Sequence, residues 1–394
     1  MNPIALYGPT GTWDADDFVA RVTRNPHRPR AKRADEVLVC STWERGTALP
    51  VGFRQVFLVE SHMQRSGAAV QGCPIALPAS LGHLADGDVV HVRPRAGHLS
   101  VVYRRNSASN SLFVTARCNS RCVMCAQPPT EHADDELRMV AMDALPLISE
   151  DTLELGITGG EPTLLGAGLI DIVRRCRALL PRTRVHLLSN GRLFRYARYA
   201  RALSDVGHPA LTVGVPLFSD LPECHDFVAQ SAGAFDQTIG GLLNLARFRV
   251  AVELRVVVQS ANVDRLPELA RFVASNLPFV RQVSLMALEP VGFARANSAS
   301  VWVSPSEYSA ALATAVDLLA AAHLCPVVMN HPLCALEESA RRYAVQSISD
   351  YKNVYPPECD TCEERSRCCG FFASADARHR VECRPLAGVL MSAV

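Results

Sequence analysis

Three cysteines lie within eight residues of the sequence, in the stretch CNSRCVMC. They are Cys118, Cys122 and Cys125, and they follow an apolar, β-branched run. This spacing lets one short loop wrap three thiolates around a single inorganic centre. Iron–sulfur clusters and structural zinc ions both normally take four protein ligands, so the set is one ligand short. The alternatives are a zinc loop with a distant fourth ligand, or three packed core cysteines.

A second motif, GITGGEPTL, ends the next predicted strand with Gly159, Gly160 and Glu161. The two glycines leave backbone groups accessible to a ligand, and the carboxylate that follows can accept a hydrogen bond from an ammonium group. Alone, the motif also suits an ordinary turn between a strand and a helix. Beside the cysteine loop, on the neighbouring strand, it favours an iron–sulfur cluster at the mouth of a barrel.

The elements that must position these motifs alternate between strand and helix from Leu112 onward. Near-continuously apolar strands between helices are typical of a parallel sheet covered by helices. Six such units are two fewer than a full (β/α)8 barrel. We therefore expect an α/β fold, a partial TIM-like (β/α)6 barrel whose chemistry lies at the carboxyl ends of its strands. The predicted strands are 112–116, 153–158, 184–189, 210–217, 250–258 and 282–288.

Three segments are predicted in the 394 residues. Residues 1–108 form a small β-rich N-terminal domain, 109–325 the barrel core, and 326–394 a cysteine-rich C-terminal segment. The last segment is polar around its cysteines and cannot build a hydrophobic core of its own, so a metal centre is the natural way to stabilise it.

The composition excludes some classes of function. The net charge is +1, so nothing in the overall charge indicates nucleic acid or an anionic membrane as a partner. The first residues lack the charged and apolar regions of a signal peptide, and we expect a cytoplasmic protein with reduced thiols. Fourteen cysteines in such a compartment indicate metal binding more than disulfide bonds.

The two motifs together resemble those of the radical SAM superfamily. The match comprises Cys118, Cys122, Cys125, the apolar Met124 and the segment 159–161, within a barrel pattern over about residues 110–325. The resemblance implies a [4Fe–4S] cluster with one open iron, which binds S-adenosylmethionine (SAM). In that family the GGE segment meets the amino group of SAM. One electron from the cluster then yields a 5′-deoxyadenosyl radical, which takes a hydrogen atom from the substrate.

Other residues fit the resemblance less specifically. Ser189 and Asn190 end the third strand and could reach the ribose or methionyl part of SAM. Arg255 lies in an otherwise apolar strand, where it needs an acidic partner, either the SAM carboxylate or a structural salt bridge. His225 and Asp226 are substrate-side candidates because their stretch is similar to one in peptide-modifying radical SAM enzymes. A helix-capping pair is the alternative.

The C-terminal cysteines resemble the auxiliary-cluster regions, of SPASM or twitch type, of radical SAM peptide maturases. This resemblance implies one auxiliary [4Fe–4S] cluster held by Cys334, Cys359, Cys362 and Cys368, with Cys369 as the alternative last ligand. Zinc is the alternative metal, because four cysteines at this spacing also suit a zinc ribbon.

Longer stretches of the chain look like HxsC-type maturases of His-Xaa-Ser peptide systems. The resemblance implies modification of a ribosomally synthesised precursor peptide by hydrogen abstraction and oxidative bond formation. It also implies a second radical SAM maturase as a partner and an external electron donor. Two alternatives stay open: a radical SAM enzyme acting on a small molecule or tRNA, and a non-catalytic iron–sulfur protein that carries electrons or scaffolds a partner. The near-neutral charge argues against tRNA.

Overall fold

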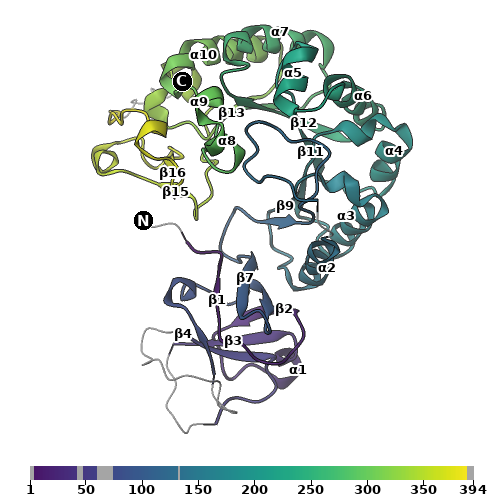
Figure 1. Ribbon diagram of the computed structural model, residues 1–394, viewed down its shortest axis with the longest axis vertical. Coiled ribbons are helices and arrows are strands. Elements are labelled where there is room, and N and C mark those ends of the chain that lie inside the picture. The colour runs from purple at the N-terminus through teal and green to yellow at the C-terminus, as the bar shows by residue number, and fades with distance from the viewer. Residues whose placement is uncertain (1–3, 42–47, 60–73, 132–133, 388–394) are drawn as a thin grey trace.

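The computed structural model describes residues 4–41, 48–59, 74–131 and 134–387 of the chain (Figure 1). The described residues form an N-terminal sheet, a curled parallel sheet surrounded by helices, and a C-terminal segment with a short hairpin. In Figure 1 helices α2 to α7 and α10 form an outer arc around the strands, with the N-terminal sheet at one end of the molecule.

The N-terminal sheet has seven strands in the order β1-β7-β6-β2-β3-β4-β5. Strands β2 to β5 run parallel to one another, whereas β1, β7 and β6 are antiparallel to their neighbours. Its apolar side chains build a core of their own, centred on residues such as Phe57 and Leu99. The strands are β1 (Tyr7–Pro9), β2 (Phe18–Thr23), β3 (Glu36–Cys40), β4 (Gln55–Val59), β5 (Ile75–Leu77), β6 (Val89–Arg93) and β7 (His98–Tyr103).

The second sheet is wholly parallel, and its order β14-β13-β12-β11-β10-β9-β8 follows the chain. The strands are β8 (Ser111–Phe113), β9 (Glu154–Thr158), β10 (Arg184–Leu188), β11 (Leu211–Pro216), β12 (Ala251–Val258), β13 (Gln282–Ala287) and β14 (Pro326–Met329). Each of the six predicted strands has its counterpart here. The seventh strand, β14, begins at the residue where the C-terminal segment was predicted to start, so the parallel sheet extends into that segment.

Helices cross between successive strands and cover the outside of this sheet. They are α2 (Asp135–Ala144), α3 (Ala167–Leu179), α4 (Ala197–Asp205), α5 (Pro222–Ala229), α6 (Ala234–Arg247), α7 (Leu266–Asn276), α8 (Phe293–Ala296), α9 (Ser298–Val301) and α10 (Pro305–Ala321); the short α1 (Arg30–Arg33) and α11 (Glu338–Arg341) lie outside this set. The curled parallel sheet with its outer helices confirms the predicted α/β partial barrel.

Local sequence explains why the helices start and pack as they do. Helix α10 begins with a capping box, in which Ser304 and Glu307 satisfy each other's backbone N–H groups, and Pro305 occupies the first turn. Helix α3 buries one stripe of apolar residues that includes Leu169 and Val173. Burial of such a stripe against the sheet, more than intrinsic propensity, stabilises these helices.

The C-terminal segment continues from β14 through α11 and the hairpin of β15 (Asn353–Val354) and β16 (Phe371–Phe372). Polar contacts join it to the rest of the molecule. Lys352 pairs with Glu289 at 3.0 Å, and Arg104, which precedes β8, pairs with Asp350 at 2.6 Å. The segment therefore lies against both the barrel and the connection to the N-terminal sheet.

Within the described part of the chain, every helix is too short or too polar to span a lipid bilayer.

Candidate active site

The loop that follows β8 lies inside the arc of helices (Figure 1), and it carries Cys118, Cys122 and Cys125. The buried Arg192, from the segment after β10, holds this loop from one side. Its guanidinium donates to the carbonyl of Asn119 and, at 2.8 Å, to the hydroxyl of Ser120, while Nε donates to Gln237. Both loop residues stand between Cys118 and Cys122, so Arg192 positions the first half of the cysteine loop.

Backbone hydrogen bonds hold the second half of the loop. The amide of Val123 donates to the carbonyl of Val228 at the end of α5, at 3.0 Å. On the other side the amide of Phe293 donates to the carbonyl of Cys125 at 2.8 Å. The segments after β11 and β13 therefore fix the loop across the mouth of the barrel.

Asp134, immediately before α2, closes the base of the loop. Its carboxylate accepts hydrogen bonds from the Thr115 hydroxyl at 2.7 Å and from the Ala116 amide, and it pairs with Arg117 at 3.1 Å. These donors outweigh the effect of burial and lower the pKa of Asp134. The residue is therefore an anionic anchor for the start of the cysteine loop.

The two glycines of the GGE motif are required by close backbone packing. The amide of Gly160 donates to the carbonyl of Thr115, and that of Glu161 donates to the carbonyl of Arg117, both at 2.8 Å. A Cβ atom on Gly159 would lie 2.4 Å from the Thr115 oxygen, and one on Gly160 would lie 2.3 Å from the Arg117 oxygen. Only glycine allows the two loops to approach this closely.

The Glu161 side chain turns away from the cavity and is fully buried. Its carboxylate accepts from the Thr163 amide and hydroxyl at 2.9 and 2.5 Å, from the Ser189 hydroxyl at 2.8 Å and from the Asn190 amide at 2.6 Å. Both carboxylate oxygens are thus used to join the loop after β9 to the loop after β10. The sequence predicted this carboxylate as an acceptor for an ammonium group, whereas in the structure it positions its neighbours.

Ser189 and Asn190 are placed by that carboxylate at the edge of the cavity. The Asn190 side-chain amide donates to Asn119 Oδ1 at 2.6 Å and lies 4.0 Å from the Cys118 sulfur. The Ser189 hydroxyl donates to Glu161 and accepts from the Gly191 amide at 3.1 Å. Asn190 is therefore in direct contact with the cysteine loop, while the Ser189 hydroxyl is mostly occupied internally.

A cavity of about 330 Å³ lies above the carboxyl ends of the strands. Its walls include the three cysteines, Gly159, Gly160, Ser189, Asn190, Met124 and Arg255, which are the predicted cofactor-binding residues apart from Glu161. The structure thus brings together residues from seven separate stretches of the sequence around one space.

Burial sets the protonation of the thiols around this cavity. Burial raises the pKa of Cys118 to about 11, and burial together with the neighbouring Cys118 and Cys125 thiols raises that of Cys122 to about 12. Three thiols that resist ionisation together fit a site in which bound metal supplies the compensating positive charge. The donor set is therefore suited to a thiolate-ligated iron–sulfur cluster.

Arg255 on β12 has its structural partner within the barrel. Its Nη1 lies 3.4 Å from both carboxylate oxygens of Glu253, which also pairs with His186 on β10 at 2.6 Å. Burial alone would raise the pKa of Glu253, but His186, Arg255 and Ser284 lower it to about 2. The salt bridge offered as an alternative for Arg255 is therefore present, and the same side chain also faces the cavity.

Gly214 on β11 makes room for this group of charges. A Cβ atom there would lie 2.7 Å from His186 Nε2 and 3.1 Å from Arg255 Cδ. Below it a second cavity of about 990 Å³ runs toward the amino ends of the strands, and its walls again include Arg255. The lumen of the barrel is therefore hollow on both sides of Arg255.

His225 and Asp226, the predicted substrate-side pair, lie outside the walls of both cavities. The buried His225 accepts a hydrogen bond from the Phe218 amide at 3.2 Å. Asp226 accepts from the amides of Gly233 and Phe235, at 2.5 and 2.8 Å, at the start of α6. In this structure both side chains act as local positioning groups, in line with the capping alternative.

The C-terminal cysteines form a second group. Cys368 accepts hydrogen bonds from the amides of Leu333 and Gly370, both at 3.4 Å, and Cys362 accepts from the amide of Leu386 at 3.4 Å. Amide donors aimed at sulfur stabilise thiolates and are a common feature around iron–sulfur clusters.

Cys383 also belongs to this group, because its sulfur lies 3.5 Å from that of Cys359. Burial and the nearby Cys383 and Cys368 thiols raise the pKa of Cys334 to about 11. Cys369 lies beside Cys368 in this group, is buried against Ile348 and donates its thiol hydrogen to the carbonyl of His331 at 3.2 Å. The geometry thus adds Cys383 to the predicted ligand candidates.

Sequence reasoning missed three residues that shape these sites: Arg192, Asp134 and Cys383. For Arg192 a signal existed, since it follows the Ser-Asn-Gly segment at the end of a strand, but its target lies on another loop. For Asp134 the position before a helix indicated a cap and not a contact with residues 115–117. Cys383 was not among the predicted ligands, because its closeness to Cys359 depends on the fold of the C-terminal segment.

The core of the chain is similar to known proteins. Residues 112–273 match the family model described as "Radical SAM superfamily". A GTP 3′,8-cyclase of Limosilactobacillus fermentum is 28% identical over 265 residues, which cover 65% of this chain and 74% of that protein. A GTP 3′,8-cyclase of Streptomyces coelicolor is 34% identical over 202 residues, which cover 47% of this chain and 56% of that protein.

Among solved structures, the S-adenosylmethionine-bound SuiB of Streptococcus suis is similar over 55% of this chain and 49% of its own. The identity is 13% and the TM-score is 0.44.

These relatives correct the predicted function and partners. The curated proteins named above are GTP 3′,8-cyclases, which act on a small molecule. The predictions of a precursor-peptide substrate and of peptide-system partners are therefore wrong. The alternative of a radical SAM enzyme acting on a small molecule fits these relatives better. The coarser prediction, a resemblance to the radical SAM superfamily, agrees with the match of residues 112–273 to that family model.

Proposed function

We propose that this protein is a radical SAM enzyme that cleaves SAM reductively and removes a hydrogen atom from a small-molecule substrate. The observation that carries the proposal is the cavity of about 330 Å³ whose walls combine Cys118, Cys122 and Cys125 with Gly159, Gly160 and Arg255. The match of residues 112–273 to the superfamily model supports the same reading.

In this proposal the three cysteines hold the cluster, and the backbone of Gly159 and Gly160 meets the cofactor's amino group. Glu161 acts indirectly, because its carboxylate fixes the loops on either side. Asn190 contacts the loop beside Cys118 and borders the same cavity. Arg255 is the cationic side chain in the cavity wall that would pair with a cofactor carboxylate. Glu253 holds its guanidinium in place.

When bound, the cluster supplies one electron to SAM, and the reactive fragment that results removes hydrogen from the substrate. The chain's task is to keep water and other donors away from that event. Met124, Phe218 and Leu288, all buried, belong to one apolar cluster beside the cysteines and border the cavity. Such walls favour transfer of hydrogen from a bound substrate over loss to solvent.

The C-terminal cysteines are proposed to hold one auxiliary [4Fe–4S] cluster, with zinc as the alternative metal. Candidate ligands are Cys334, Cys359, Cys362, Cys368 and, from its position, Cys383. Three amide N–H groups already point at two of these sulfurs. An external electron donor would reduce the first cluster.

The relatives favour a nucleotide as the first substrate to test. With clusters reconstituted without oxygen, the protein is mixed with dithionite and SAM, with and without GTP, and 5′-deoxyadenosine is measured. We expect 5′-deoxyadenosine to form, and to increase with GTP. Absence of the product under both conditions would contradict SAM cleavage. Product that GTP leaves unchanged would retain cleavage and reject GTP.

A matched pair of cysteine variants tests the site. Cys122→Ala should abolish 5′-deoxyadenosine, because it removes one of the three ligands. Cys325→Ala should leave it unchanged, since that exposed thiol lies outside both cysteine groups. Equal activity of the two variants would refute the ligand assignment.

A further inference from the structure

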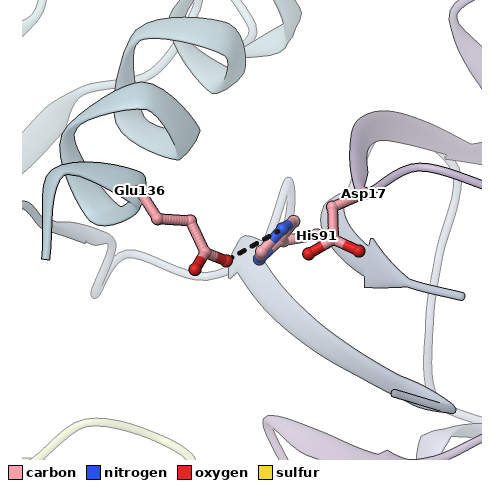
Figure 2. A group of neighbouring side chains, drawn as sticks. All are labelled: Asp17, His91 and Glu136. Carbon is pink, nitrogen blue, oxygen red and sulfur yellow. Dashed lines mark ion pairs between the residues drawn. The ribbon is translucent and has the colours of Figure 1, made fainter. Parts of the chain in front are cut away.

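Asp17, His91 and Glu136 come together where the N-terminal sheet meets the barrel. Their ligand atoms all lie within 4.8 Å of one another, and His91 lies between the two carboxylates (Figure 2). His91 Nε2 is 3.8 Å from the nearer Glu136 oxygen. This group is separate from both sets of cysteines.

The fold explains why these residues meet. Strands β2 and β6 pair antiparallel with Val19 opposite His91, so Asp17 and His91 project from the same face of the sheet. Glu136 lies in the first turn of α2, which packs against that face. His91 thus comes from β6 and Glu136 from α2, while Asp17 immediately precedes β2.

Apart from the ion pair between His91 and Glu136, the polar atoms of this group have no partners among the described residues. His91 is only 9% exposed, yet it makes no hydrogen bond to any residue in the described part of the chain. The carboxylates of Asp17 and Glu136 also make none within the described residues, although they lie close enough to repel each other. A buried imidazole and two facing carboxylates without donors are a set that a cation would satisfy.

An unprotonated imidazole nitrogen is the form of histidine that ligates metals.

We propose that Asp17, His91 and Glu136 bind a divalent first-row transition-metal ion at this junction. One imidazole nitrogen and two carboxylate oxygens suit ions such as Mn²⁺, Fe²⁺ or Zn²⁺, with water in the remaining positions. Asp17 and Glu136 are exposed, which leaves space for those waters.

The position of the ion has a structural consequence. Asp134, two residues before Glu136, anchors residues 115–117 at the base of the cysteine loop. A metal at Glu136 would tie the N-terminal sheet to the helix that carries this anchor. The site is thus a clamp between the N-terminal domain and the part of the barrel that holds the cysteines.

Mn²⁺ is the probe of choice, because it prefers oxygen and nitrogen to the thiolates of the cysteine groups. The cluster-reconstituted full chain is stripped of loose metal and titrated with Mn²⁺, with free Mn²⁺ followed by EPR. We expect one saturable site. His91→Ala and Glu136→Gln should each weaken it at least about tenfold, since loss of an outer contact alone can cost that much.

His98→Gln is the matched control, because His98 lies on the adjacent strand β7 outside the group. It should bind Mn²⁺ like the wild type. Mn²⁺ should also raise the melting temperature of the wild type and not that of Glu136→Gln, an exposed position where folding is not at risk. Absence of a saturable site, or equal affinity in wild type and Glu136→Gln, would overturn the proposal.

Discussion

Individual residues at this site serve mainly to hold other residues in place. Glu161 belongs to the most recognisable motif of the chain, yet two of its four hydrogen bonds go to Thr163 in its own loop and two to the loop of Ser189 and Asn190. Arg192 and Asp134 do the same for the cysteine loop. The groups that border the cavity are therefore positioned by polar side chains behind them.

His225 offers a test of such a buried group. Its ring lies between Phe218 and Phe235, and burial lowers its pKa to about 4, from an ordinary value of 6.5. The imidazole is neutral in the fold, so its contribution to stability is complete above pH 6.5 and is lost as the pH falls toward 4.

We expect the wild type to lose roughly 2 kcal/mol of unfolding free energy between pH 7.5 and 5 through His225. His225→Gln, which keeps an acceptor for the Phe218 amide, should lose less over the same range in urea titrations. His27→Gln, at an exposed histidine, should behave like the wild type. Equal pH dependence of all three proteins would contradict the assignment.

The role of a residue could be predicted from the sequence only where its interaction partners lie nearby in the chain. The cysteine spacing and the GGE motif are local, and both lie where predicted, at the mouth of the barrel. The role of Glu161 was not predictable, because its partners Ser189 and Asn190 are almost thirty residues away. For Arg255 both a structural and a ligand role were foreseen, and the structure supplies the Glu253 partner.

At the scale of elements, close contacts between helices and loops hold the loops of the site in position. Helix α6 packs on the turn after β10, and Gly241 makes this possible: a Cβ there would lie 2.1 Å from the Gly191 carbonyl oxygen. The preceding Gly240 has open space around it, with its nearest contact at 3.7 Å. Two adjacent glycines of one helix thus have opposite roles.

Gly241→Ala should push α6 away from the turn that carries Asn190 and Arg192, and should lower the unfolding free energy by about 1–3 kcal/mol. Gly240→Ala should be neutral or stabilise by about 0.5–1 kcal/mol, because alanine is the better helix former. Thermal or urea unfolding of the two variants, with iron content as a second readout, distinguishes them. A greater loss in Gly240→Ala would refute this packing argument.

The order of strands and helices could be predicted from the sequence because each element of the barrel carries its own apolar pattern. Five of the six predicted strands begin and end within one residue of the observed bounds. The first, predicted over 112–116, is observed over Ser111–Phe113 and is shorter. The seventh strand lies in the segment that was predicted as separate from the barrel, since its pairing with β13 is a long-range contact that no local pattern shows.

At the scale of the whole molecule, the C-terminal segment brings a second group of cysteines against the barrel. Its salt bridges reach both Glu289, at the wall of the cavity, and Arg104, before the first barrel strand. Sequence alone did not assign Cys383 to this group, because Cys359 and Cys383 meet only after the segment folds back on itself.

Cys383→Ser should therefore remove the auxiliary metal, while Cys369→Ser should keep it, since Cys369 is buried with Ile348 and Phe372. Iron and sulfide analysis of reconstituted protein should show about four iron atoms fewer in the first variant only. The reverse result would assign the position to Cys369.

The two cavities that share Arg255, Met286 and Asn330 give the lumen an upper and a lower entrance. A ligand held against the cysteines at the upper end leaves the lower end accessible, past the first residues of β9, β10 and β13. With two separate entrances, two ligands can bind in either order. The charged group of His186, Glu253 and Arg255 stands at the point where their paths would meet.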